Sequence, residues 1–79
     1  MIHEALKSLN EAEKAVISAQ GNPGSAEFQR AYQKLQLAKE RVAQAKSSGL
    51  EPDGKHRLDL ASEHLIHLHE TMEALQDQL

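Results

Sequence analysis

The segment AEFQRAYQKLQLAKERVAQAK, residues 26–46, decides the fold class of this chain. Read in alternating steps of about three and four residues, it gives an unbroken apolar series. The series is Phe28, Ala31, Leu35, Ala38, Val42 and Ala45. Because an α-helix repeats every ~3.6 residues, these side chains share one helical face. No part of the sequence alternates with the period of a strand, so we predict an all-α protein.

The same spacing continues on both sides of this segment. The earlier series is Ile2, Ala5, Leu9, Ala12, Val16 and Ala19, and the later series is Leu58, Ala61, Leu65, Leu68, Met72, Leu75 and Leu79. Three amphipathic helices are therefore expected. They should cover about residues 2–20, 26–48 and 55–77 of a single domain that spans residues 1–79.

Two stretches rich in turn-forming residues separate the expected helices. The first is QGNPGS, residues 20–25, and the second is SSGLEPDG, residues 47–54. Gly21 and Gly49 each suit the left-handed conformation that commonly ends a helix. Ser25 and Asp53 can each accept a hydrogen bond from a free amide at the start of the next helix. Loops this short favour antiparallel neighbours.

The first two helices share a repeated pattern of small residues. At an offset of 26 residues their series match, with a larger apolar residue at each first position and alanine at each second position. Because alanine adds little bulk, the two helices should approach toward the close end of the usual spacing of about 8–10 Å. The third helix should fill the groove beside them, where it meets Leu6, Ile17 and Tyr32. The predicted architecture is an antiparallel up-down-up three-helix bundle with an Ala-rich, close hairpin of helices one and two.

The net charge of −3 is unevenly distributed. Residues 21–50 carry more basic than acidic side chains, whereas residues 51–79 are strongly acidic. One interpretation is that the two segments face each other and help to set the topology. The alternative is that the basic segment binds a phosphate-bearing partner. Nucleic acid is not the expected partner, because the whole chain is acidic and one nearby aromatic residue, Tyr32, gives no stacking platform.

Several classes of function lack the residues that they need. The chain has no cysteine, which excludes disulfides, thiolate metal sites and cysteine nucleophiles. It has no glycine-rich phosphate loop and no nucleophile elbow, and no hydroxyl residue is accompanied by a base and an oxyanion donor. We therefore expect a protein that is not an enzyme and carries no cofactor. No apolar run is long enough for a membrane span or a secretory signal, so we expect a cytoplasmic protein without a membrane partner.

The stretch EHLIHLHE, residues 63–70, contains three histidines and two glutamates at its ends. At about 100° per residue, Glu63, His67 and Glu70 fall on the side of the third helix that points away from its apolar series. An imidazole between two carboxylates can bind Zn, Ni or Co ions, so these three residues are a candidate metal site. Two other interpretations are a solvated helix face and a pH sensor in which protonation of His67 relieves repulsion among the acidic residues.

Three aliphatic residues, Leu37, Leu60 and Ile66, do not belong to the apolar series. A chain of 79 residues is barely large enough for one core, so additional burial between chains would stabilise it. We expect these residues to form an interaction surface for a homodimer or for a helical protein partner. The layout is similar to that of many small bacterial helical proteins, but no motif identifies a family. The predicted function is a self-associating protein–protein interaction module, and the alternative is a divalent-metal-binding or metal- or pH-sensing protein.

Overall fold

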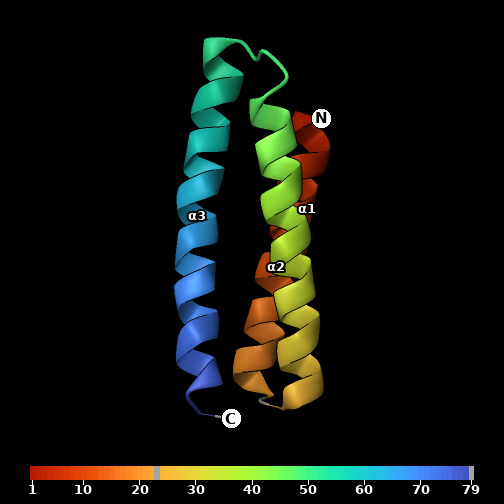
Figure 1. Ribbon diagram of the computed structural model, residues 1–79, viewed down its shortest axis with the longest axis vertical. Helices are drawn as coiled ribbons and strands as arrows, with labels where there is room; N and C mark the ends of the chain where they lie inside the picture. The colour runs from red at the N-terminus through yellow and green to blue at the C-terminus, as the bar shows by residue number, and fades with distance from the viewer. Residues whose placement is uncertain (23, 79) are drawn as a thin grey trace.

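The computed structural model describes residues 1–22 and 24–78. Within them the chain forms three α-helices: α1, Ile2–Gly21; α2, Ser25–Lys46; and α3, Pro52–Gln76. Each helix runs antiparallel to the one before it, and every pair of helices is in contact (Figure 1). The bundle is elongated, with principal extents of 41, 16 and 16 Å. The predicted all-α, up-down-up three-helix bundle is confirmed.

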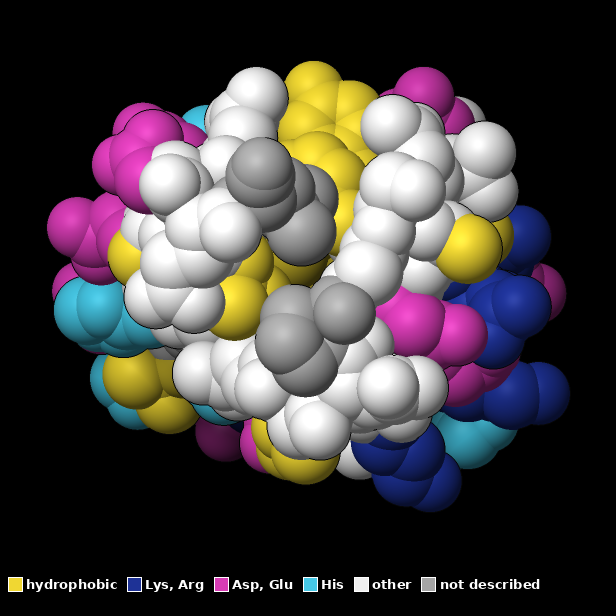
Figure 2. Space-filling model, turned by 90° about the horizontal axis from the view of Figure 1, so that it is seen from below, with side chains coloured by type: hydrophobic (Ala, Val, Ile, Leu, Met, Phe, Trp, Pro, Cys, Tyr) yellow, Lys and Arg dark blue, Asp and Glu magenta, His cyan; other side chains and the backbone are white. Residues whose placement is uncertain are grey.

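The core of the bundle consists of the apolar series predicted from the sequence. Its buried members are Ala5, Ala12, Val16 and Ala19 in α1, Ala31, Leu35, Ala38, Val42 and Ala45 in α2, and Leu58, Ala61, Leu65, Leu68 and Met72 in α3. Ile2, Leu9, Phe28 and Leu75 are partly buried against this core. Figure 2 shows hydrophobic side chains between the helices in a view along the bundle. Leu79, the last member of the predicted series, lies outside the described residues.

The contact between α1 and α2 is the most extensive of the three helix pairs. Ala12 in α1 and Ala38 in α2, which correspond in the repeat, have no exposed surface. Small side chains along a seam allow two helices to stay close over many turns. This packing agrees with the Ala-rich hairpin predicted for helices one and two.

The second and third helices begin earlier than predicted. Gly24 is the N-cap residue of α2, so Ser25 lies inside the helix and does not cap it. Glu51 is the N-cap residue of α3, and Pro52 is the first helical residue. Proline suits this position because its fixed φ is already helical and the amide that it lacks would have no partner there. Asp53 therefore lies in the first turn of α3, and the prediction that it caps the helix is wrong.

The prediction that a left-handed glycine ends each of the first two helices is wrong at both loops. Gly49 has a φ of +73°, in the left-handed region, and α2 has already ended at Lys46. The hydroxyls of Ser47 and Ser48 donate to backbone carbonyls of the last turn, at 2.9 and 2.6 Å, and so help to end α2 before residue 48. Gly21 does not adopt a left-handed conformation and is the last residue of α1.

Two of the three residues expected to lie under the third helix remain exposed. Leu6 is partly buried against the core, as expected. However, the exposed fraction is 57% for Ile17 and 41% for Tyr32. The contact between α1 and α3 is the least extensive of the three pairs, so α3 leaves the flank of α1 around Ile17 uncovered. The ring of Tyr32 stacks on Phe28, with the ring centroids 6.4 Å apart.

Ion pairs connect the basic helix α2 to both of its neighbours. The pairs are Lys34–Glu11 at 3.6 Å and Arg41–Glu4 at 3.3 Å toward α1, and Lys46–Asp59 at 3.6 Å toward α3. The basic segment thus faces the acidic third helix, as expected, but it also faces α1. All of these side chains are substantially exposed, so each pair contributes only about 0.2–1 kcal/mol.

Candidate protein interaction surface

Leu37, Leu60 and Ile66 are exposed, as predicted, but they lie in three different grooves. Their exposed fractions are 38, 53 and 59%. Leu37 lines a groove between α1 and α2, Leu60 lines one between α1 and α3, and Ile66 lines one between α2 and α3. The bundle thus distributes the three residues around its circumference, and each has to be considered with its own groove.

The groove at Leu37 is polar. Its other lining residues are Glu4, Lys7, Ser8, Glu11 and Arg41. Two ion pairs, Arg41–Glu4 and Lys34–Glu11, join α1 to α2 along this side. An apolar partner docking here would remove charged groups from water without offering them better partners, which opposes association.

The groove at Leu60 has a volume of about 330 Å³. Its apolar part is formed by Leu6, Leu9, Leu60 and Ala61, and its polar part by Asn10, Glu13, Arg57 and His64. His64 Nε2 lies 2.8 Å from Glu13 Oε2, although the two groups are not aligned as a hydrogen bond. This contact links α3 to α1 across the groove. It therefore covers part of the surface on which a partner would dock.

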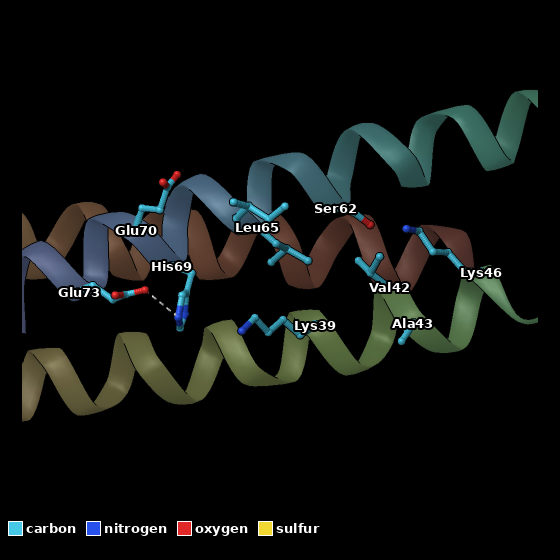
Figure 3. A pocket seen from close by; sticks show the side chains of 10 residues that line it. Lys39, Val42, Ala43, Lys46, Ser62, Leu65, His69, Glu70 and Glu73 are labelled. Carbon is cyan, nitrogen blue, oxygen red and sulfur yellow. Dashed lines mark ion pairs between the residues drawn. The ribbon is translucent and has the colours of Figure 1, made fainter.

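The groove at Ile66, between α2 and α3, is larger, with a volume of about 480 Å³ (Figure 3). The apolar part of its lining is formed by Val42, Ala43, Leu65 and Ile66. Lys39 and Lys46 of α2 form a basic rim on one side, and Glu70 and Glu73 of α3 form an acidic rim on the other. Ser62 and His69 complete the lining. We call this whole set of ten residues the α2/α3 face.

Helical spacing explains why these residues lie together. On α2 the lining residues 39, 42, 43 and 46 follow the spacing of a single helical stripe. On α3 a matching stripe runs from residue 62 to residue 73. Because the stripes lie beside the buried series, each presents both aliphatic and charged residues to the groove. The sequence singles out Ile66, but Ala43 and the two charged rims become recognisable only once the helices are assembled.

Two histidines of α3 lie beside the carboxylates of the acidic rim. His69 Nε2 is 3.1 Å from Glu73 Oε1, and His67 Nδ1 is 3.3 Å from Glu70 Oε1. His69 Nδ1 is buried and has no hydrogen-bond partner among the described residues. Each carboxylate of the acidic rim therefore has an imidazole next to it. When that imidazole binds a proton, the carboxylate has a positive charge beside it.

The predicted metal-binding residues are only partly brought together. His67 and Glu70 form an exposed contact, and Glu63 is also exposed on α3. Within residues 1–22 and 24–78, no group of three or more histidine, aspartate or glutamate side chains is placed to hold a metal ion. One chain in this arrangement therefore supplies fewer ligands than Zn, Ni or Co sites usually have.

Comparison with protein-family models, with curated proteins and with solved structures gives no match to this chain. None of the three helices in the described part of the chain has the length and apolar character needed to cross a membrane. The α2/α3 face combines the exposed aliphatic side chain of Ile66 with two lysines on α2 and two glutamates on α3. Its chemistry is suited to contact with a protein surface.

Proposed function

We propose that this protein is a non-enzymatic protein interaction module that forms a homodimer through the α2/α3 face. The observation that carries this proposal is that Ile66, which is 59% exposed, lines a groove with lysines on α2 and glutamates on α3. Full burial of an exposed aliphatic side chain is favourable by about 1.5–3 kcal/mol, and burial of the exposed part of Ile66 contributes the corresponding share. The two rims let the face complement a second copy of itself.

The dimensions of the bundle support a contact of this kind. One long side measures 41 by 16 Å between the extremes of the Cα trace. A standard protein interface buries about 800 Å² on each partner, which is comparable to one such side. Because a single small core provides limited stabilisation, burial of a second apolar surface would also stabilise each chain.

Substitutions in the grooves at Leu37 and Leu60 test whether the dimer forms through the α2/α3 face. Leu37→Glu and Leu60→Glu are each expected to leave the dimer dissociation constant within about threefold of the original value, because neither residue lies in the α2/α3 face. Sedimentation velocity over a dilution series of each variant gives the constants. Loss of the dimer in either variant would move the interface away from α2 and α3.

Self-association is also expected to weaken as the pH falls. When His67 and His69 bind protons, they neutralise Glu70 and Glu73, and the acidic rim loses its attraction for the basic rim of a second copy. Between pH values of about 8 and 5.5, the dissociation constant should rise roughly three- to tenfold. Lys39 and Lys46 are the facing charged groups on α2.

Histidine substitutions provide the control for this pH effect. The double variant His67→Gln, His69→Gln should lose most of the pH dependence, whereas His56→Gln should keep it, because the partners of Glu70 and Glu73 are His67 and His69 and not His56. Sedimentation velocity at both pH values measures the effect. Equal pH dependence in the two variants would show that the rim histidines do not control association.

A further inference from the structure

The charged rims specify how two copies of the chain would face each other. We infer that the copies are related by a two-fold axis parallel to the helices, so that α2 of each copy packs on α3 of the partner subunit. This inference rests on the proposed dimer through the α2/α3 face and adds its geometry and its pairing residues.

Two identical elongated faces can be joined by a two-fold axis in two simple ways. If the axis is perpendicular to the helices, α2 lies on α2 and α3 lies on α3. If the axis is parallel to the helices, α2 lies on α3 in both halves of the interface. In both cases Ile66 lies within the contact, so the apolar residues do not distinguish them.

Charge does distinguish the two arrangements. With the perpendicular axis, the basic rim formed by Lys39 and Lys46 lies against the same rim of the partner, and the acidic α3 lies against another acidic α3. With the parallel axis, the basic rim of each copy lies against the acidic rim formed by Glu70 and Glu73 of the partner subunit. Opposite charges across the interface favour the parallel axis, and like charges across the interface oppose the perpendicular axis.

Rotation about an axis parallel to the helices does not change the height of a residue along the bundle, which we call its level. The levels of the charged groups agree with this axis. Lys46 and Asp59 lie at one level, with Nζ and Oδ1 3.6 Å apart, so Lys46 also reaches the level of Asp59 of the partner subunit. The side chain of Lys39 points along α2 toward the end of the groove that holds His69 and Glu73 (Figure 3). It therefore extends toward the level of Glu73 of the partner subunit.

Helix directions fit this arrangement too. Within one chain α2 and α3 are antiparallel (Figure 1). A parallel two-fold axis preserves the direction of every helix, so α2 is antiparallel to α3 of the partner subunit as well. The four helices at the interface then form an antiparallel bundle in which oppositely directed helix dipoles are neighbours.

A variant with exchanged rims tests the axis. It carries Lys39→Glu, Lys46→Glu, Asp59→Lys, Glu70→Lys and Glu73→Lys, so that α2 bears the acidic rim and α3 the basic rim. With the parallel axis this variant pairs with itself as the unmodified chain does. A mixed dimer of the variant and the unmodified chain would instead place like charges on both halves of the interface.

The two chains are mixed, allowed to exchange and examined by native mass spectrometry. We expect the mixed species to make up fewer than about one dimer in ten. A control mixture of ¹⁵N-labelled and unlabelled unmodified chains should reach the random proportion of about one mixed dimer in two, which establishes that subunits exchange. Far-UV circular dichroism of the variant checks that it is folded.

The possible results separate the axis from the dimer itself. If both chains form dimers and the mixed species dominates or assorts at random, the parallel axis is wrong while the homodimer through the α2/α3 face stands. If the unmodified chain is monomeric in the control mixture, the proposed dimer is wrong and the axis is overturned with it. Only strong self-sorting of two dimeric chains supports the inference.

Discussion

Replacement of Ile66 by glutamate is expected to convert the homodimer into a folded monomer of 8.8 kDa. By symmetry the change acts twice in the interface. Each copy loses the burial of the exposed part of Ile66, about 1–2 kcal/mol, and gains a carboxylate that must leave water. Together these losses should raise the dissociation constant about a thousandfold or more. Sedimentation equilibrium measures the constant, and circular dichroism should show unchanged helix content because Ile66 is 59% exposed in the single chain.

Ile17→Glu is the matched control for this change. Ile17 has nearly the same exposed fraction, 57%, and also lies on a helix, but it belongs to α1 and lies outside the α2/α3 face. The control should keep the dissociation constant of the unmodified protein. If both variants dissociate, general loss of surface hydrophobicity explains the effect, and if neither dissociates, Ile66 is not at an interface.

Leu35→Ala is expected to produce the largest loss of folding stability among simple truncations. Leu35 has no exposed surface and belongs to α2, which packs against both other helices. Removal of a buried leucine side chain typically lowers the free energy of unfolding by about 2–5 kcal/mol, because apolar contact is lost and a cavity remains. Small domains have only about 5–15 kcal/mol in total, so much of the protein should be unfolded at modest urea concentrations.

Leu37→Ala provides the comparison for Leu35→Ala, since it makes the same chemical change two positions along the same helix. Leu37 is 38% exposed, so its truncation should lower the free energy of unfolding much less. Urea unfolding followed by circular dichroism is best measured in the Ile66→Glu background, so that dissociation does not add to the unfolding free energy. Equal losses for the two leucines would contradict the assignment of Leu35 to the core.

The fold could be predicted because one signal recurs without exception. Steps of three and four residues place Leu35 and its equivalents on one face of each helix, and that face is the buried one in the structure. Helix ends were less predictable, because several residues can compete for a cap. The N-cap residues are Glu51 and Gly24 instead of Asp53 and Ser25, so both helices start earlier than predicted.

The interaction surface could be predicted only in part. The exposure of Ile66 follows from its angle on one helix, but its neighbours Lys39 and Ala43 belong to another helix. Which groove a flanking residue lines depends on how the helices are rotated against one another, and a single helical wheel does not contain that information. The same reason explains why Ile17 was expected under α3 and remains exposed.

The histidines illustrate the same limit. The wheel of the third helix groups Glu63, His67 and Glu70, and the structure does place His67 beside Glu70. Two other contacts depend on the assembled bundle or on side-chain rotamers: His64 with Glu13 of α1, and His69 with Glu73 at the rim of the groove. Residues that flank the buried series therefore contribute more to the candidate surface than the outward-facing stripe does.

The measurement that tests the central claim most directly is the molar mass of the unmodified protein in solution. Multi-angle light scattering after size exclusion, at a concentration of tens of micromolar and with or without a chelator, is sufficient. A homodimer through the α2/α3 face predicts a mass near twice 8.8 kDa that does not change with chelator. A mass of 8.8 kDa under both conditions would contradict the homodimer. A mass that falls to 8.8 kDa only with chelator would instead assign the contact to a metal ion held between chains, with Glu63, His67 and Glu70 as its first candidate ligands.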